Sequence, residues 1–186
     1  MDLASLWLTI LLSAVAVCFV AMTISGPGLH HKHDYFTLPT ADEDTLMDTF
    51  RKLGIKPGNY VIPDIRSHVP LDPEKVKKAL EQGPVAHLTL WRTPLTMGDK
   101  MIATLIVHIV VTFAIAYLAS IAIPGPASFA RVFRVVGTAG VLAYSFAFIP
   151  VCIWDGTYVR SIVFRVLDGI VYGLITGAIF AWRWPH

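Results

Sequence analysis

The sequence predicts a membrane all-α fold: a four-transmembrane-helix bundle with a small α/β extramembrane domain between spans one and two. Hydrophobic residues make up 55% of the 186 residues and charged residues 15%, which is outside the usual range for a soluble domain. Four apolar runs, at residues 3–24, 101–123, 132–154 and 161–182, can each cross a hydrocarbon core of about 30 Å as a helix. Because these runs are continuous and not alternating, they exclude a β-barrel.

The runs divide the chain into three parts. We expect residues 1–25 to form the first transmembrane helix, residues 26–100 the extramembrane domain and residues 101–186 the other three helices. The first run lacks a basic start and is about twice as long as the apolar part of a signal peptide, so we expect an uncleaved span.

The extramembrane domain is predicted to contain two helix and strand units. In the first, Thr40 or Asp42 caps a helix that runs to about Leu53, Gly54 ends it, and residues 60–62 form a strand.

In the second unit Asp72 caps a helix with Pro73 at its first position, Gly83 ends it, and residues 85–91 form a strand. Both helices are amphipathic, so we expect them to pack on a small sheet, with residues 35–38 as an edge strand. A parallel strand pair, joined through the second helix, is the simplest topology for this linker length.

Spans two, three and four are joined by short turns, which makes them antiparallel neighbours and places both termini on one side of the membrane. Arg131, Arg134 and Arg183 lie with the termini. A loop longer than about 60 residues counts weakly in the positive-inside rule, so we expect cytoplasmic termini.

A buried polar cluster is predicted on the domain side of the bundle. His108 on span two and Asp168 on span four each lie about seven residues, or roughly 10 Å, below that surface, which makes them candidate partners. Arg165, Tyr144 and Cys18 fall at similar depths. Such groups often mark a proton path, a ligand site or a metal site. The structural alternative, which we favour, is that Arg165 reaches the interface and pairs with Asp168, while His108 bonds locally.

Small residues on spans three and four predict close helix packing. The five glycines that repeat along these two spans are Gly137, Gly140, Gly169, Gly173 and Gly177. Glycine at four-residue spacing lets two backbones approach each other. We expect packing within the chain rather than dimerisation.

Directly after span one the sequence is dense in potential metal ligands, His30, His31, His33 and Asp34. With His68 or His87 these could form a Zn or Cu site. The spacing matches no standard metal motif, and we favour an interfacial segment that contacts lipid headgroups. No cofactor is therefore expected, with Zn or Cu as the alternative.

The chain resembles a group of uncharacterised bacterial membrane proteins of similar length. The resemblance rests on the runs "LHHKHDYFTLPTADE", "VFRVVGTAG" and "VLDGIVYGLITGAIFAWRWP", and it is most specific in the last span. It implies four spans and a bacterial inner membrane, with no assigned activity, ligand or catalytic residue. The chain departs from the pattern at Gly28-Leu29, where a proline would precede the histidines, and at Asp155, where an aromatic residue is common.

These features favour an accessory or scaffold subunit of a larger membrane complex, with the lipid bilayer and other membrane protein subunits as partners. The alternative is a metal- or proton-handling protein that uses the histidine run and a His108–Asp168 pair. A small enzyme acting on lipid is a third hypothesis, although the sequence contains no phosphate loop, nucleophile elbow or paired catalytic carboxylates. A net charge of +2 without a basic stripe excludes nucleic acid.

Overall fold

The computed structural model describes residues 3–25, 31, 34–64, 72–92, 94 and 96–185. Its internal contacts divide the chain into two compact units. The first unit comprises Met1–Tyr35 and Met97–His186 and contains the bundle; the second comprises Phe36–Thr96.

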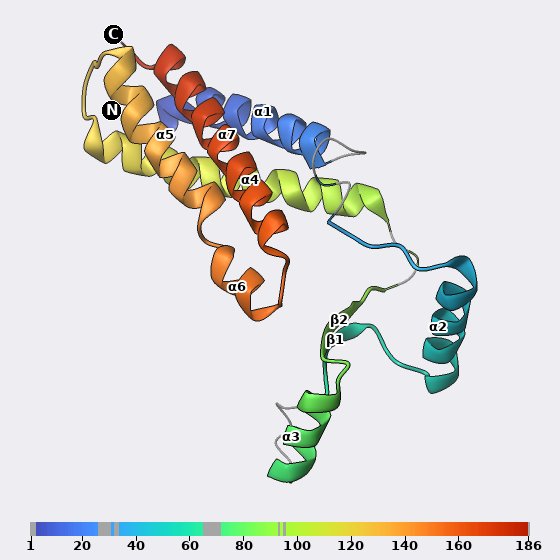
Figure 1. Cartoon of the computed structure of the whole chain (residues 1–186). Coiled ribbons are helices and arrows are strands. Elements are labelled where there is room, and N and C mark those ends of the chain that lie inside the picture. The colour runs from blue at the N-terminus through green and yellow to red at the C-terminus, as the bar shows by residue number, and fades with distance from the viewer. Residues whose placement is uncertain are drawn as a thin grey trace. The chain divides into compact units, whose positions relative to one another are not determined.

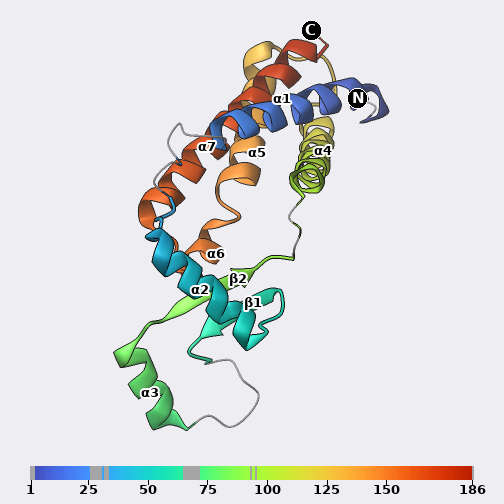
Figure 2. The ribbon, with the colours of Figure 1, turned by 90° about the vertical axis from the view of Figure 1, so that its right-hand side faces the viewer.

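The first unit contains four helical segments that are long and apolar enough to cross a membrane, which confirms the predicted fold class (Figure 1). Span one is α1 (Trp7–Ser25), preceded by the short helix η1 (Leu3–Leu6). Span two is α4 (Met97–Ala122), and span four is α7 (Val159–Arg183). The start of α1 and the end of α7 lie at the same end of this bundle (Figure 2).

Span three is not the single helix that the sequence analysis predicted. It divides into α5 (Phe129–Ser145) and α6 (Ile149–Trp154), with turn residues 146–148 between them. Pro150 lies in the first turn of α6. A proline has no backbone N–H, and its ring clashes with the carbonyl four residues earlier, so a helix that continued through Phe146 would be disrupted.

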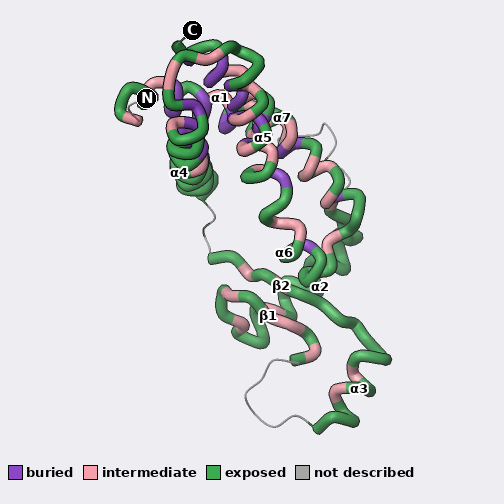
Figure 3. Tube along the Cα trace, turned by 90° about the vertical axis from the view of Figure 1, so that its left-hand side faces the viewer, coloured by how far each residue is buried: buried purple, intermediate pink, exposed green. Residues whose placement is uncertain are grey.

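The apolar core of the bundle lies at the end that holds the termini. It brings together Leu6 of η1, Ile123 after α4, Val132 of α5 and Phe180 of α7, all nearly inaccessible to solvent. Trp184 joins this core and donates from Nε1 to the Gly125 carbonyl at 3.1 Å, which ties the end of α7 to the loop between α4 and α5. In Figure 3 the buried positions lie in the bundle, whereas the described residues of the second unit are intermediate or exposed.

The helices α5 and α7 pack more closely on each other than any other pair. A Cβ added at Gly140 would lie 2.8 Å from the Gly173 Cα, and one added at Gly177 would lie 2.8 Å from the Gly137 Cα. One added at Gly169 would lie 2.5 Å from the Tyr144 carbonyl oxygen. The five glycines therefore form one contact surface inside this chain. At Gly140, Gly169, Gly173 and Gly177 only glycine permits this approach, whereas a Cβ added at Gly137 would lie 3.9 Å from the Gly173 carbonyl oxygen, an ordinary contact.

The second unit contains α2 (Thr40–Leu53), β1 (Gly58–Ile62), α3 (Pro73–Gln82) and β2 (Ala86–Leu90). Three of the four predicted helix boundaries carry the expected chemistry. Gly83 follows the end of α3 with a φ of 61°, and its backbone N–H donates to the Ala79 carbonyl. Gly54 ends α2 with a left-handed φ of 61°, and the Asp72 side chain accepts a 3.1 Å hydrogen bond from the Glu74 backbone N–H. The fourth does not, because α2 begins after Pro39, and no side chain caps it.

The predicted parallel strand pair is wrong. β1 and β2 pair antiparallel, with Gly58 opposite Leu90 and Ile62 opposite Ala86. A strand-helix-strand crossover would bury one face of α3 on the sheet, whereas neither α2 nor α3 has a buried residue. The expected helix packing on the sheet is therefore also wrong, and residues 35–38 form no strand.

Candidate functional site

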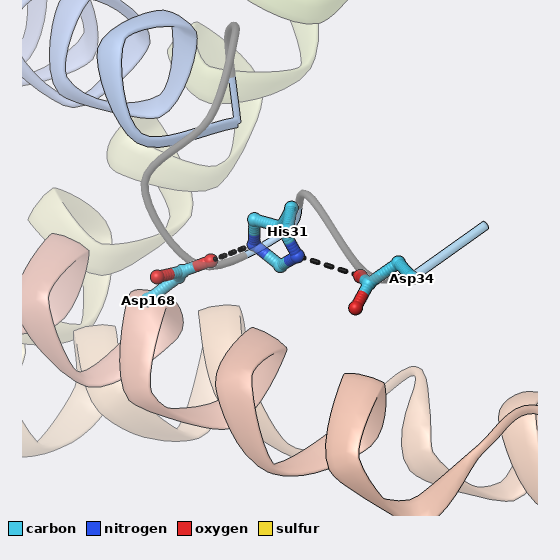
Figure 4. Close-up of polar contacts among 3 residues, drawn as sticks. All are labelled: His31, Asp34 and Asp168. Atoms are coloured by element: carbon cyan, nitrogen blue, oxygen red, sulfur yellow. Dashed lines mark hydrogen bonds and ion pairs between the residues drawn. The ribbon is translucent and has the colours of Figure 1, made fainter. Parts of the chain in front are cut away.

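A histidine that bridges two carboxylates lies at the end of the bundle opposite the core (Figure 4). The His31 Nδ1 atom is 2.7 Å from Asp34 Oδ2, and its Nε2 atom is 2.7 Å from Asp168 Oδ2. Asp168 comes from the third turn of α7, whereas His31 and Asp34 come from the segment that follows α1. We call these three residues the Asp–His–Asp cluster.

The cluster is largely withdrawn from solvent. The side chains of His31, Asp34 and Asp168 are 15%, 4% and 8% exposed. Burial without partners would make such charges costly, but here opposite charges face each other at hydrogen-bond distance. The two contacts therefore fasten the segment after α1 to the membrane-spanning helix α7.

Burial alone would lower the pKa of His31, but the hydrogen bonds to Asp168 and Asp34 and the two negative charges outweigh it. They raise the pKa of His31 above its usual value of about 6.5. Its stabilising contribution is therefore complete below about pH 6.5 and is lost as the pH rises through the raised pKa.

Burial alone would likewise raise the pKa of Asp34. The hydrogen bond with His31, the nearby Ser161 hydroxyl and the positive charges of His31 and Arg165 outweigh this effect and lower the pKa below its usual value of about 3.9. Its contribution is present above about pH 3.9 and is lost as the pH falls through the lowered pKa. Between these limits the cluster stabilises the folded chain most.

A pocket of about 420 Å³ opens beside the cluster. We call it the aromatic pocket, because Tyr35, Tyr144, Phe148 and Tyr172 line it together with the three cluster residues and Arg165. The break between α5 and α6 borders this pocket, since Phe148, the last of the turn residues 146–148, is one of its lining residues.

The predicted direct pair of His108 and Asp168 is wrong. The ring of His108 is buried, and neither of its nitrogens has a hydrogen-bond partner among the described residues. Its neighbours are Tyr144 and Tyr172, whose ring centroids lie 5.8 and 6.4 Å away. Counting along the helices gave a similar depth for both residues, but Asp168 turns toward His31 instead.

Of the other members of the predicted polar cluster, two lie beside Asp168 and one does not. Tyr144 and Arg165 line the aromatic pocket, and the Tyr144 hydroxyl lies 3.4 Å from Thr112 Oγ1. Cys18 is buried in α1 and does not line this pocket. Arg165 is exposed and lies one helical turn before Asp168. Its positive charge acts on the carboxylate of Asp34, which lies outside the span.

Of the four candidate metal ligands, His31 and Asp34 are among the described residues, whereas His30 and His33 lie outside them. Of the two additional candidates, His68 also lies outside the described residues, and His87 lies on β2. Both ring nitrogens of His31 face carboxylate oxygens, so in this arrangement neither presents a lone pair to a metal ion. Within the described part of the chain, no group of three or more His, Cys, Asp or Glu side chains is placed to hold a metal.

Sequence reasoning missed three aromatic members of the site, Tyr35, Phe148 and Tyr172. One signal was available, because Tyr172 follows Asp168 by four residues and therefore shares its helix face. No comparable pattern marks Tyr35 or Phe148, which lie in non-helical segments. No protein-family model, curated protein or solved structure matches this chain.

Proposed function

We propose that this chain is a multi-pass protein of a bacterial inner membrane that binds and releases a proton at the Asp–His–Asp cluster. The pair of 2.7 Å contacts at His31 carries the proposal. Ionised carboxylates only accept hydrogen bonds, so the two contacts need either two N–H donors or one protonated carboxyl group. The cluster thus holds one proton more than a neutral histidine beside two carboxylates.

Release of this proton has a structural consequence. A neutral imidazole donates through one nitrogen only, so either Asp34 or Asp168 loses its hydrogen bond. The charged and titratable groups that face the cluster across the aromatic pocket are Arg165, Tyr35, Tyr144 and Tyr172. Proton release would therefore loosen the segment after α1 from α7, which couples protonation to conformation.

Nitrogen-15 NMR of the histidine rings in the detergent-solubilised protein tests this proposal. We expect one doubly protonated imidazole that persists above pH 6.5, because both carboxylates stabilise the charged form. His31→Gln should remove this signal, whereas His87→Gln, on β2, should leave it in place. A His31 ring that is neutral at pH 6.5, with Asp34 and Asp168 both ionised, would contradict the proposal.

A second candidate function, accessory or scaffold subunit of a membrane complex, is supported by the second unit. Leu46, Met47 and Leu53 of α2 are 42%, 45% and 68% exposed, and Leu80 of α3 is 42% exposed. Isolated helices shorter than about 12 to 15 residues are marginal in water, so an amphipathic face without a buried residue favours a protein partner that covers it.

Purification from native membranes in mild detergent tests this second function. We expect a stoichiometric complex that is lost in the Leu46→Ser and Leu53→Ser double variant, because apolar contact area disappears. Asp44→Ser, a polar change on the same helix, is the matched control and should keep the complex. A monomer that purifies without any other subunit would contradict a scaffold role.

A further inference from the structure

The aromatic pocket combines charges of both signs with aromatic rings. Arg165 presents an exposed guanidinium, while Asp34 and Asp168 are buried carboxylates. A guanidinium binds phosphate oxygens in a two-point geometry. Carboxylates and aromatic faces attract an ammonium group. A ligand that matches this surface carries a phosphate and an ammonium a short distance apart.

One polar side-chain atom among the described residues that line the pocket lacks a hydrogen-bond partner. Oδ1 of Asp34 is buried and accepts no hydrogen bond of normal geometry in the described part of the chain, although the Ser161 hydroxyl lies near this carboxylate, whereas Oδ2 is engaged by His31. A buried acceptor without a donor costs about 1 to 3 kcal/mol, and more when it is charged. An N–H donor from a ligand would satisfy it without displacing His31.

The pocket also lies at a suitable level of the bundle. Arg165 is six residues beyond the first residue of α7, about 9 Å along the helix, and Asp34 lies outside the spans. Tyrosine is enriched at the interfacial level of membrane proteins, where lipid headgroups lie, and the long side chain of an arginine can reach this level from within a span. A cavity of about 420 Å³ falls within the range of small-ligand sites.

We infer that the aromatic pocket binds the headgroup of an ethanolamine phospholipid, with the phosphate on Arg165 and the ammonium donating toward Asp34 between the aromatic rings. A purely anionic headgroup would place its charge beside two carboxylates. A simple cation would be repelled by the guanidinium of Arg165. The zwitterionic ethanolamine headgroup offers a phosphate to the guanidinium and an ammonium to the carboxylates. This inference goes beyond the proposed proton binding and does not depend on it, because the two carboxylates keep their Oδ2 contacts with His31.

Native mass spectrometry of the full chain tests this inference, with three probes at constant pH. The probes are short-chain phosphatidylethanolamine, phosphatidylglycerol with the same acyl chains, and free phosphoethanolamine. We expect the ethanolamine lipid to bind about tenfold or more tightly than the glycerol lipid, because only the former offers an ammonium to Asp34. Free phosphoethanolamine should bind more weakly than the lipid, since it has no apolar part.

Two variants separate the two halves of the site. Arg165→Gln should weaken both lipids by about tenfold, because it removes the phosphate partner. Asp34→Asn should weaken only the ethanolamine lipid. Arg160→Gln is the matched control, since Arg160 lies on the same helix with its guanidinium 5.4 Å from the Phe164 ring centroid and does not line the pocket.

Because the Arg165 side chain is exposed, its replacement keeps the fold, and thermal unfolding of each variant checks this directly. Equal affinity for the two lipids would overturn the inference, and so would equal effects of Arg165→Gln and Arg160→Gln. The proton proposal would remain intact in either case, because the histidine titration measures it separately.

Discussion

Gly173→Ala is expected to destabilise the bundle by about 2 kcal/mol or more, or to prevent it from folding. The added Cβ would lie 2.8 Å from the Gly140 carbonyl carbon and 2.8 Å from the Val141 Cα, both of them backbone atoms. A side chain could rotate away from such a contact, but a helix backbone must move as a whole. Alanine gains about 1 kcal/mol in helix propensity over glycine, which the overpacking outweighs. The free energy of unfolding in mixed micelles measures the difference.

Gly98→Ala is the matched control for this prediction. Gly98 lies in the first turn of α4, and apart from its chain neighbours and the adjacent backbone of α4 itself, no atom lies within 4 Å of the position that its Cβ would take. Alanine at this position should be neutral or slightly stabilising. If the two variants unfolded with the same free energy, the close packing of α5 on α7 would not be a feature of the folded protein.

Asp168→Asn is expected to cost about 1.5 to 3 kcal/mol of unfolding free energy at about pH 6, the usual contribution of a hydrogen bond to a charged group. Asparagine keeps the shape of the side chain but removes the negative charge that holds His31 protonated. The pKa of His31 should fall accordingly. As the pH rises through the raised pKa of His31, the stability of the wild-type chain should decrease toward that of the variant.

A double-mutant cycle with His31→Gln isolates the contact. If His31 and Asp168 stabilise the chain through each other, the double variant should lose clearly less than the sum of the two single losses. This coupling should shrink above the raised pKa of His31, because the imidazole is then neutral. Additive losses at about pH 6 would show that the two residues act independently.

The sequence was sufficient to locate the helices but not to orient them. The end of α2 at Gly54 and the start of α3 at Asp72 follow from local chemistry that four or five residues contain. Strand direction does not, because five-residue strands pair equally well either way when a long connection joins them. Pro150 was a visible signal, yet a proline in a membrane helix can either kink or break it.

The partner of Asp168 illustrates the same limit. Depth along a helix follows from counting residues at 1.5 Å each, so the level of Asp168 could be predicted. The direction in which its side chain points depends on how α7 rotates against α5, which the close contact at Gly140 and Gly173 determines. His31 lies in a segment without periodicity, where no counting rule predicts position.

The apolar core and the Asp–His–Asp cluster occupy opposite ends of the bundle, and this separation has a consequence for mutational tolerance. Asp168 and Phe180 are twelve positions apart on α7, or roughly 18 Å. Substitutions at such distances usually add without interaction. The polar end can therefore accumulate changes in its chemistry independently of the core, and losses of stability there can be compensated by improved packing around Trp184.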